Sequence, residues 1–421
     1  MQINFLDLFA GAGGLSEGFI QAGYSPVAHV EMDVGACFTL KTRSAYHWLK
    51  SNDLEHIYNS YLSNNISREE LYSHIPPNIL DSVINDEINE ESLPRIFKSI
   101  DVKLQHKKVD LIVGGPPCQA YSIVGRSRDK NRMVGDKRNY LFKFYAEFLK
   151  KYKPKYFVFE NVLGLLSAKD QDNELYFNKM KNVFNECGYE IEYSSLDSSE
   201  YGIPQARKRI ILIGKFSEYK NKDFFSLFKP SRKKIPTREV LEDLPILRAG
   251  GGTHKLQPLK DIEINPYLIE SGIRKPKISH VTWHQARPNI DRDLNIYKIA
   301  ASLWNTKKTR LKYNELPSNL KTHNNTRSFL DRFKVVAQDQ PSHTIVAHIS
   351  KDGHYYIHPD QDQNRSITVR EAARIQTFPD DFYFESASGK PSRTAAFKQI
   401  GNAVPVLLAK QIANQLKDSF I

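Results

Sequence analysis

Short apolar runs alternate with segments of helical apolar spacing over the first half of the chain. The runs have the length of strands and occupy residues 3–8, 27–30, 109–113, 156–159 and 210–213. Segments with helical spacing lie between them, at residues 15–22, 139–151 and 175–187. Strands that alternate with helices predict an α/β fold built on a doubly wound, mostly parallel sheet.

The alternation is lost between residues 216 and 365, where prolines and the glycines at 250–252 break the chain into short pieces. We interpret residues 230–365 as a second, smaller and irregular lobe. Helical spacing returns at 368–377 and 404–416, so we expect residues 366–421 to return to the first domain, residues 1–229. Within that domain, residues 51–100 are polar and poorly periodic, which predicts an irregular, partly helical insertion.

The composition excludes several classes of protein. Apolar residues make up 40% of the 421 residues and charged residues 26%, and no run reaches the roughly 18 apolar residues of a membrane span. The N-terminus lacks the basic stretch of a signal peptide. Cys37, Cys118 and Cys187 are too few and too widely spaced to build a disulfide framework or a zinc site. We therefore expect a protein of the reducing cytosol, with no membrane and no metal.

Positive charge is concentrated in one region. Lys and Arg exceed Asp and Glu by 60 to 48, a formal net charge of +12. Residues 206–340 hold 28 basic and 13 acidic side chains, a surplus of +15, so the other 286 residues carry −3. A concentrated surplus favours a phosphate backbone as partner, although a solvated basic surface would give the same count.

A glycine turn follows the first predicted strand and precedes the first predicted helix. It reads Asp-Leu-Phe-Ala-Gly-Ala-Gly-Gly at residues 7–14, and its glycines allow a ligand to approach the backbone at a helix N-terminus. The spacing matches neither the dinucleotide fingerprint nor a P-loop, which disfavours phosphate nucleotides. Glu31 ends the second strand, where an acid can accept hydrogen bonds from both hydroxyls of a ribose.

Further reactive groups lie at the carboxyl edge of the predicted sheet. Gly-Gly-Pro-Pro-Cys-Gln at 114–119 follows a strand, and its glycines and prolines place Cys118 on a rigid loop, as a nucleophile needs. Glu160 ends the strand at 156–159, where it either caps the next helix or, in a pocket without water, donates a proton. On an extended backbone, Arg207 and Arg209 share one face.

Six short blocks, in this order, resemble the DNA (cytosine-5)-methyltransferase family, whose members methylate carbon 5 of cytosine with S-adenosylmethionine (AdoMet). The blocks are the glycine turn at 7–14, Gly-Pro-Pro-Cys-Gln at 115–119, Glu-Asn-Val at 160–162, Gln-x-Arg-x-Arg at 205–209, Arg-Glu-Ala-Ala-Arg-Ile-Gln at 370–376 and Gln-Ile-Gly-Asn-Ala-Val-Pro at 399–405. The resemblance implies a class I, Rossmann-like AdoMet-dependent catalytic domain, with a target-recognition domain at 230–365. It says little about the sequence of 230–340 or 51–100.

The resemblance also implies roles for individual residues. Cys118 would add to carbon 6 of the cytosine, Glu160 would bind ring N3 and the exocyclic amine, and Arg207 and Arg209 would line the pocket, with Arg207 the contact to the base or the catalytic loop. Cofactor contacts would come from Asp7, Phe9, Gly11, Gly13, Glu31, Pro116 and Asn402. Asn85-Asp86-Glu87-Ile88 departs from the family's Asp-Ile pair. Asp86 and Glu87 therefore compete for the adenine, and we favour Asp86.

The target carbon is stacked inside a duplex, so the enzyme must turn the nucleotide out. The basic segment 120–138 follows the nucleophile, and we expect it to close over the DNA with contacts from Ser122, Arg126 and Arg128. The basic surplus of the second lobe would then contact phosphates and bases in the major groove.

The sequence thus predicts a monomeric, cytoplasmic bacterial enzyme that methylates cytosine in a short duplex DNA sequence. We expect it to protect host DNA from a cognate restriction endonuclease, although an orphan methyltransferase would look the same. The alternatives are a tRNA cytosine methyltransferase, a non-catalytic nucleic-acid-binding relative and, more remotely, a nicotinamide oxidoreductase. The basic second lobe favours duplex DNA, the presence of both Cys118 and Glu160 favours catalysis, and the glycine spacing disfavours the oxidoreductase.

Overall fold

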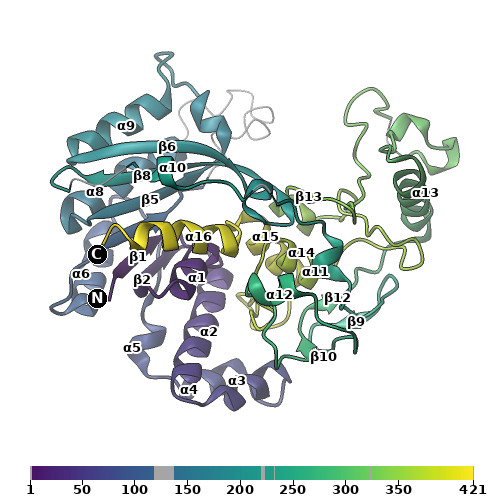
Figure 1. Cartoon of the computed structure of the whole chain (residues 1–421), viewed down its shortest axis with the longest axis horizontal. Helices are drawn as coiled ribbons and strands as arrows, with labels where there is room; N and C mark the ends of the chain where they lie inside the picture. The colour runs from purple at the N-terminus through teal and green to yellow at the C-terminus, as the bar shows by residue number, and fades with distance from the viewer. Residues whose placement is uncertain (1, 118–136, 220–222, 232, 323, 421) are drawn as a thin grey trace.

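A seven-stranded sheet forms the centre of the larger lobe (Figure 1). The computed structural model describes residues 2–117, 137–219, 223–231, 233–322 and 324–420. The strand order is β3-β2-β1-β4-β5-β8-β6, and β8 is antiparallel to both neighbours while the other pairs are parallel. This arrangement confirms the predicted fold class. The strands are β1 Asn4–Leu8, β2 Ser25–Glu31, β3 Val83–Asn85, β4 Leu111–Gly114, β5 Tyr156–Asn161, β6 Tyr189–Asp197 and β8 Lys208–Phe216.

Helices cover both faces of this sheet, because side chains of successive strand residues point to opposite faces and most of them are apolar. Phe5 belongs to a core shared with α1 (Gly14–Gln21) and α16 (Val406–Lys417). Its neighbour Leu6 belongs to the core on the other face, shared with α6 (Leu93–Leu104), α8 (Leu141–Tyr152) and α9 (Tyr176–Glu186).

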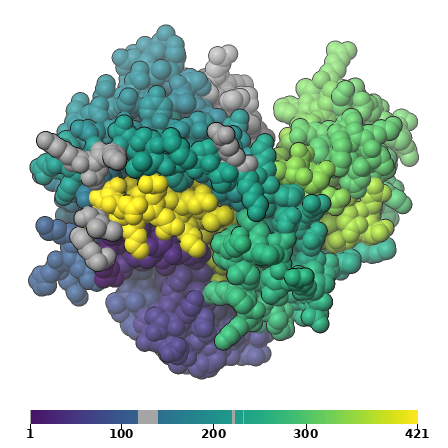
Figure 2. Space-filling view, viewed as in Figure 1, coloured from purple at the N-terminus to yellow at the C-terminus, as the bar shows by residue number. Residues whose placement is uncertain are grey.

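The C-terminal helix α16 packs closely against α1. A Cβ added at Gly18 would lie 2.5 Å from the Cβ of Ala409, and one at Gly14 would lie 2.4 Å from the carbonyl oxygen of Val404. The two glycines therefore allow an approach that a side chain would block. Figure 2 shows α16 as a yellow band between the N-terminal residues in purple and the teal residues. This contact places the end of the chain beside the first glycine turn.

Residues 51–100 are more regular than the sequence predicts. The long helix α2 (Val34–Ser51) leads into α3 (Glu55–Leu62), α4 (Arg68–Ser73) and α5 (Pro77–Leu80). Strand β3 then pairs with β2 and forms one edge of the central sheet, and α6 covers that sheet. Strand β3 has only three residues, and so short an apolar run cannot be recognised in the sequence. The sequence therefore predicts an insertion where the structure has an edge strand.

The second lobe contains short elements and one long helix, α13 (Asp291–Lys307), that the sequence analysis did not predict. The buried face of α13 includes two alanines, and polar residues fill most of its other positions, which weakens the apolar signal. The remaining elements are α10 Phe224–Leu227, α11 Arg238–Leu241, α12 Pro266–Glu270, β9 Gly252–Thr253, β10 Gln257–Pro258, β11 His280–Val281, β12 His284–Gln285 and β13 Ser342–His343. Strand β13 pairs with β7 (Gln205–Ala206), so the chain rejoins the larger lobe well before residue 365.

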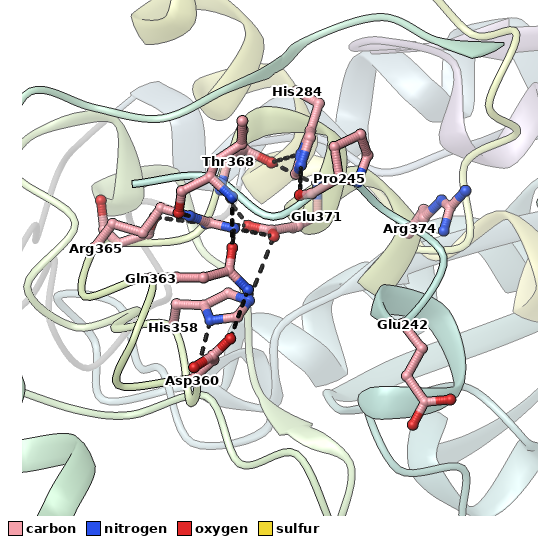
Figure 3. Close-up of polar contacts among 12 residues, drawn as sticks. Glu242, Pro245, His284, His358, Asp360, Gln363, Arg365, Thr368, Glu371 and Arg374 are labelled. Atoms are coloured by element: carbon pink, nitrogen blue, oxygen red, sulfur yellow. Dashed lines mark hydrogen bonds and ion pairs between the residues drawn. The ribbon is translucent and has the colours of Figure 1, made fainter. Parts of the chain in front are cut away.

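A buried polar network holds the start of α14 (Val369–Ile375), where the second lobe ends (Figure 3). Both carboxylate oxygens of Glu371 accept hydrogen bonds from Arg365, each at 2.7 Å, and one also accepts the backbone N–H of Thr368 at 2.7 Å. Thr368 in turn caps the helix by accepting the backbone N–H of Glu371. Burial alone would raise the pKa of Glu371, but the charge and hydrogen bonds of the Arg365 guanidinium hold it far below its usual range.

Two histidines of this network are neutral. The Nε2 of His284 donates to the carbonyl of Pro245 at 2.8 Å, so its Nδ1 accepts the hydroxyl of Thr368 at 3.0 Å. The Nδ1 of His358 accepts the backbone N–H two residues on at 3.1 Å, and its Nε2 faces Glu371 at 3.5 Å. Burial lowers the pKa of each ring to about 4.

Candidate active site

The glycine turn connects β1 to α1 through residues with positive φ. Phe9, Gly11 and Gly13 have φ values of 55°, 54° and 83°, and Gly13 is the N-cap of α1. Apart from Gly11 and its two chain neighbours, no described residue has an atom within 4 Å of the point where a Cβ of Gly11 would be. The turn therefore leaves open space directly against its backbone, as a ligand that contacts main-chain atoms requires.

Glu31 lies beside this turn, at the end of β2. Its Oε2 accepts the backbone N–H of Gly11 and its Oε1 accepts that of Asp33, both at 2.8 Å. These bonds fix the carboxylate, while burial raises the pKa of Glu31 above its ordinary value. Met32 follows and is 58% exposed. An exposed apolar side chain next to a fixed acid suits a ligand with a polar ribose and an apolar ring, and the sequence analysis did not single it out.

Asp86 follows β3 and lies against Glu31 through the backbone, since its N–H donates to the Glu31 carbonyl at 3.0 Å. Its carboxylate accepts hydrogen bonds from Arg95, from Nε at 2.5 Å and from Nη2 at 2.6 Å. These bonds lower the pKa of Asp86. The side chain of Glu87 is exposed. Both competing acids thus lie at the same sheet edge, and only Asp86 is held in place.

Three other expected cofactor residues take different positions. Asp7 is 1% exposed, with its Oδ2 at 3.5 Å from Nδ1 of His29. Pro116 is buried, and its carbonyl accepts the side-chain amide of Asn161 at 3.3 Å. Asn402 is exposed and ends α15 (Arg393–Asn402), directly before the residues that contact Gly14. Asp7 therefore lies beneath the turn, whereas Asn402 lies at its surface.

The loop that leads to the thiol passes directly against Glu160. A Cβ added at Gly115 would lie 2.3 Å from the carbonyl oxygen of Glu160 and 3.0 Å from its Oε2. Cys118 comes three residues later and lies outside the described residues, as do the three expected DNA contacts Ser122, Arg126 and Arg128. The described residues of the loop that leads to Cys118 therefore lie next to Glu160, the acid that we expect to act together with the thiol.

Glu160 forms an ion pair with Arg209 on the adjacent strand. Nε of Arg209 lies 2.8 Å from Oε1 of Glu160, and the two side chains are 13% and 14% exposed. The pairing follows from the sheet, because β5 ends and β8 begins at the same edge. The pair remains reachable from solvent while most of its surface is covered, which suits a group that recognises a substrate.

Arg207 has a different environment from Arg209. It is 1% exposed, and its Nη1 donates to the carbonyl of Ile345 at 2.7 Å and to that of Gly401 at 3.3 Å. A Cβ at Gly401 would lie 2.2 Å from the backbone nitrogen of Ala347, so these segments are in tight contact. The guanidinium of Arg207 joins backbone segments, whereas Arg209 lies beside Glu160; a contact of Arg207 with the base or the catalytic loop stays a prediction.

The glycine turn and the acids beside it are the features of this sheet edge that fit AdoMet. The space against Gly11 admits a ligand, and the fixed carboxylate of Glu31 suits ribose hydroxyls. Among the described residues, Oδ1 of Asp7 is buried without a hydrogen-bond partner. No group of three or more His, Cys, Asp or Glu residues suited to a metal ion occurs in the described part of the chain, and no described helix is long and apolar enough to cross a membrane.

Comparisons with known proteins agree with this site. The family of C-5 cytosine-specific DNA methylases matches residues 3–71 and 70–418. The type II methyltransferase M.Bpa9945I of Bacillus paralicheniformis is 43% identical, with 98% of each chain covered. M.DdeI of Desulfomicrobium norvegicum, also a type II methyltransferase, is 30% identical over 98% of this chain and 88% of its own.

The fold has solved neighbours as well. An E. coli structure, assigned as a prophage-encoded DNA modification methyltransferase, matches with a TM-score of 0.63 at 21% identity, covering 100% of this chain and 99% of that one. At this identity the likeness concerns the fold alone. The family match spans nearly the whole sequence and includes the strand ends that carry Glu31, Glu160 and Arg209. The chain therefore belongs to the C-5 cytosine-specific DNA methylases, enzymes that transfer a methyl group to carbon 5 of cytosine in DNA.

Proposed function

We propose that Cys118 activates the cytosine by covalent addition. Its thiolate would attack carbon 6 of a cytosine turned out of the duplex, which makes carbon 5 nucleophilic. Bound AdoMet supplies an electrophilic methyl group. Carbon 5 would take the methyl group from the sulfonium, whose sulfur keeps the bonding electrons and leaves as a neutral thioether. A base would then remove the proton of carbon 5, the bond between Cys118 sulfur and carbon 6 would break, and the ring double bond would re-form with release of the thiolate. The contact of Gly115 with Glu160 is the observation that carries this proposal.

Glu160 and Arg209 would recognise the ring while the thiolate adds. The Glu160 carboxyl group would interact with ring N3 and the exocyclic amine, where charge changes during addition. Arg209 holds that carboxylate through its Nε. We assign Arg209 to the pocket wall, and Arg207 to the support that fixes the strand and the segments behind it.

The cofactor would lie over the glycine turn at the ends of β1, β2 and β3. Gly11 leaves the backbone accessible and Phe9 flanks it, while the buried Gly13 is the N-cap of α1. Glu31 would bind the ribose, and Asp86, held by Arg95, is the better-placed acid for adenine than the exposed Glu87. Further contacts would come from Met32, Pro116 and Asn402, while Asp7 would support the turn from beneath.

DNA would contact the segment after Cys118, through Ser122, Arg126 and Arg128, and the basic second lobe. The surplus of +15 in residues 206–340 supports a polyanionic substrate. We propose that residues 230–365 read the target sequence, while residues 1–229 and 366–421 form the catalytic domain. We further propose that the protein is a monomer of the bacterial cytoplasm that protects chromosomal DNA from a restriction endonuclease; two of its relatives are bacterial type II methyltransferases.

A mechanism-based trap tests the covalent step. Duplex DNA that carries 5-fluorocytosine at the target should form a complex with the wild-type enzyme and AdoMet that survives denaturation, since fluorine cannot leave as a proton does. The Cys118→Ser variant should bind the same DNA and AdoMet without forming this complex. Trapping by the serine variant, or no trapping by an active wild-type enzyme, would reject Cys118 as nucleophile. Incorporation of labelled methyl groups into duplex DNA and into tRNA, measured in parallel, distinguishes a DNA methyltransferase from a tRNA methyltransferase.

A further inference from the structure

Lys334, in the second lobe, is a buried lysine without an anionic partner. The residue is 8% exposed, and within the described residues no carboxylate forms an ion pair with it. Lysine is almost never buried to this degree unless it is paired, because an unpaired charge loses its hydration. The residue keeps 8% of its surface exposed, and a lysine of this kind covers its apolar stem while the charged end points toward solvent.

The groups around Lys334 leave its charge uncompensated. The Tyr355 ring lies 4.8 Å from the ammonium, and the tyrosine hydroxyl donates to the carboxylate of Asp331 at 2.8 Å. Arg310 adds a second positive charge close by, while His343 is kept neutral because burial lowers its pKa to about 3. Burial, and next the charge of Arg310, lower the pKa of Lys334 to about 8, and Asp331 opposes this only in part. Two cations therefore share one acid that already accepts a hydrogen bond.

This cluster borders the junction between the lobes. The carbonyl of Tyr355 lies 2.6 Å from Nε2 of His343, which belongs to β13. Strand β13 pairs with β7, and the chain runs from β7 directly into β8 with Arg209, the partner of Glu160. Figure 1 places β13 where the two lobes meet.

We propose that Lys334, with Arg310 beside it, binds a backbone phosphate of the DNA strand that carries the target cytosine. The inference rests on DNA as the substrate and adds a residue that positions it. A phosphate would supply the negative charge that the buried ammonium lacks, and it would accept a charge-assisted hydrogen bond.

Replacing Lys334 separates a binding role from a structural one. Lys334→Met keeps the volume of the stem, and it should weaken binding of a target duplex about tenfold or more and reduce the slope of log affinity against log salt by about 1. Its unfolding midpoint should be equal or higher, because an uncompensated buried charge is removed. Lys334→Arg should retain most of the affinity. Lys351→Met, at an exposed lysine of the same lobe, should change neither the slope nor the midpoint.

A phosphate scan identifies the contact. In duplexes whose phosphates near the target cytosine are replaced singly by neutral methylphosphonates, one position should weaken wild-type binding about tenfold and cause no further loss in Lys334→Met. Two results would overturn the proposal. One is that the loss of affinity caused by Lys334→Met adds to the loss caused by the methylphosphonate at every position. The other is that Lys334→Met has a lowered unfolding midpoint and an unchanged affinity. The wild-type enzyme is first shown to methylate the unmodified duplex, so a failure of the proposed function would be seen there and not in the scan.

Discussion

Gly115 allows the thiol loop to pass Glu160 at a distance that no other residue permits. A Cβ at this position would lie 2.3 Å from a carbonyl oxygen, so Gly115→Ala must move either the loop or the carboxylate. A displacement of about 1 Å at a reacting group can cost on the order of 100-fold in rate. We therefore expect methyl transfer by Gly115→Ala to fall about 100-fold in single-turnover assays, with AdoMet binding retained. Activity within a few-fold of wild type would show that the loop does not act from this position.

Arg207 and Arg209 differ in burial, and their substitution should have different effects. Arg207→Met leaves the carbonyls of Ile345 and Gly401 without donors, which should lower the free energy of unfolding by about 1–3 kcal/mol. Arg209→Met should lower stability less than Arg207→Met, because Arg209 is 13% exposed and Arg207 only 1%, but it should abolish most methyl transfer. Urea unfolding and methylation rates of both variants check this assignment. The reverse pattern would exchange the two roles.

At this scale the sequence predicted which residues meet better than it predicted what each one does. The alternation of a strand predicts that Arg207 and Arg209 share one face, whereas the structure gives them different environments; the strand ends bring Glu160 and Gly115 together. Which arginine becomes buried depends on segments near residues 345 and 401, far away in the sequence. The bond between Arg95 and Asp86 likewise requires the turn between β3 and α6, which periodicity does not reveal.

Gly18→Ala, in the contact between α1 and α16, is a matched control for Gly115→Ala. A Cβ at Gly18 would lie 2.5 Å from the Cβ of Ala409, but at a helix contact away from Glu160. Gly18→Ala should therefore lower the free energy of unfolding by about 1–3 kcal/mol through overpacking. The methylation rate of the folded fraction should stay near that of wild type at low temperature. Unchanged thermal stability would mean that the two helices separate easily.

The network at the start of α14 predicts how stability depends on pH. His284 and His358 have pKa values of about 4 in the folded protein, compared with about 6.5 when unfolded. Between these values the unfolded chain binds protons that the folded chain does not, so the free energy of unfolding falls as pH is lowered from about 6.5 toward 4. Each histidine contributes up to about 1.4 kcal/mol per pH unit.

Denaturant unfolding at about pH 7, 6 and 5 measures this slope. His358→Gln removes one of the two titrating rings and should reduce the slope by about one proton. His56→Gln, at an exposed histidine of α3, should leave it unchanged. A slope in His358→Gln equal to that of the wild type would show that His358 is not kept neutral by folding.

The sequence predicts the central strands that have helices on either side in the chain, but it does not predict the short edge strand, the helix α13 or the two-residue strands. Strands β1, β4, β5 and β8 are apolar on both faces, so their runs stand out from the surrounding sequence. Strand β3 is short and lies at a sheet edge, and α13 buries a face that includes alanines, so neither gives a strong period. Short pairs such as β13 with β7 depend on contacts between distant segments, which the local sequence does not contain.

At the scale of the whole molecule, the second lobe is joined to the catalytic lobe by backbone contacts around Arg207 and by the buried network of α14. The basic surplus lies in the same part of the chain, 206–340. Cofactor turn, base pocket and basic lobe are thus tied to one another through residues 342–347 and 399–404. This connection accounts for the return of the family pattern at the C-terminus, which the sequence blocks at 370–376 and 399–405 already indicated.

The central claim is that this protein places methyl groups on carbon 5 of cytosine in duplex DNA. The most direct measurement is base-resolution mapping of 5-methylcytosine in genomic DNA from a host without cytosine methylation, after expression of the wild-type chain or of Cys118→Ser. We predict 5-methylcytosine at one short sequence throughout the genome with the wild type and none with the variant. Genomic DNA without 5-methylcytosine, despite folded wild-type protein, or the same methylation with Cys118→Ser, would contradict the account.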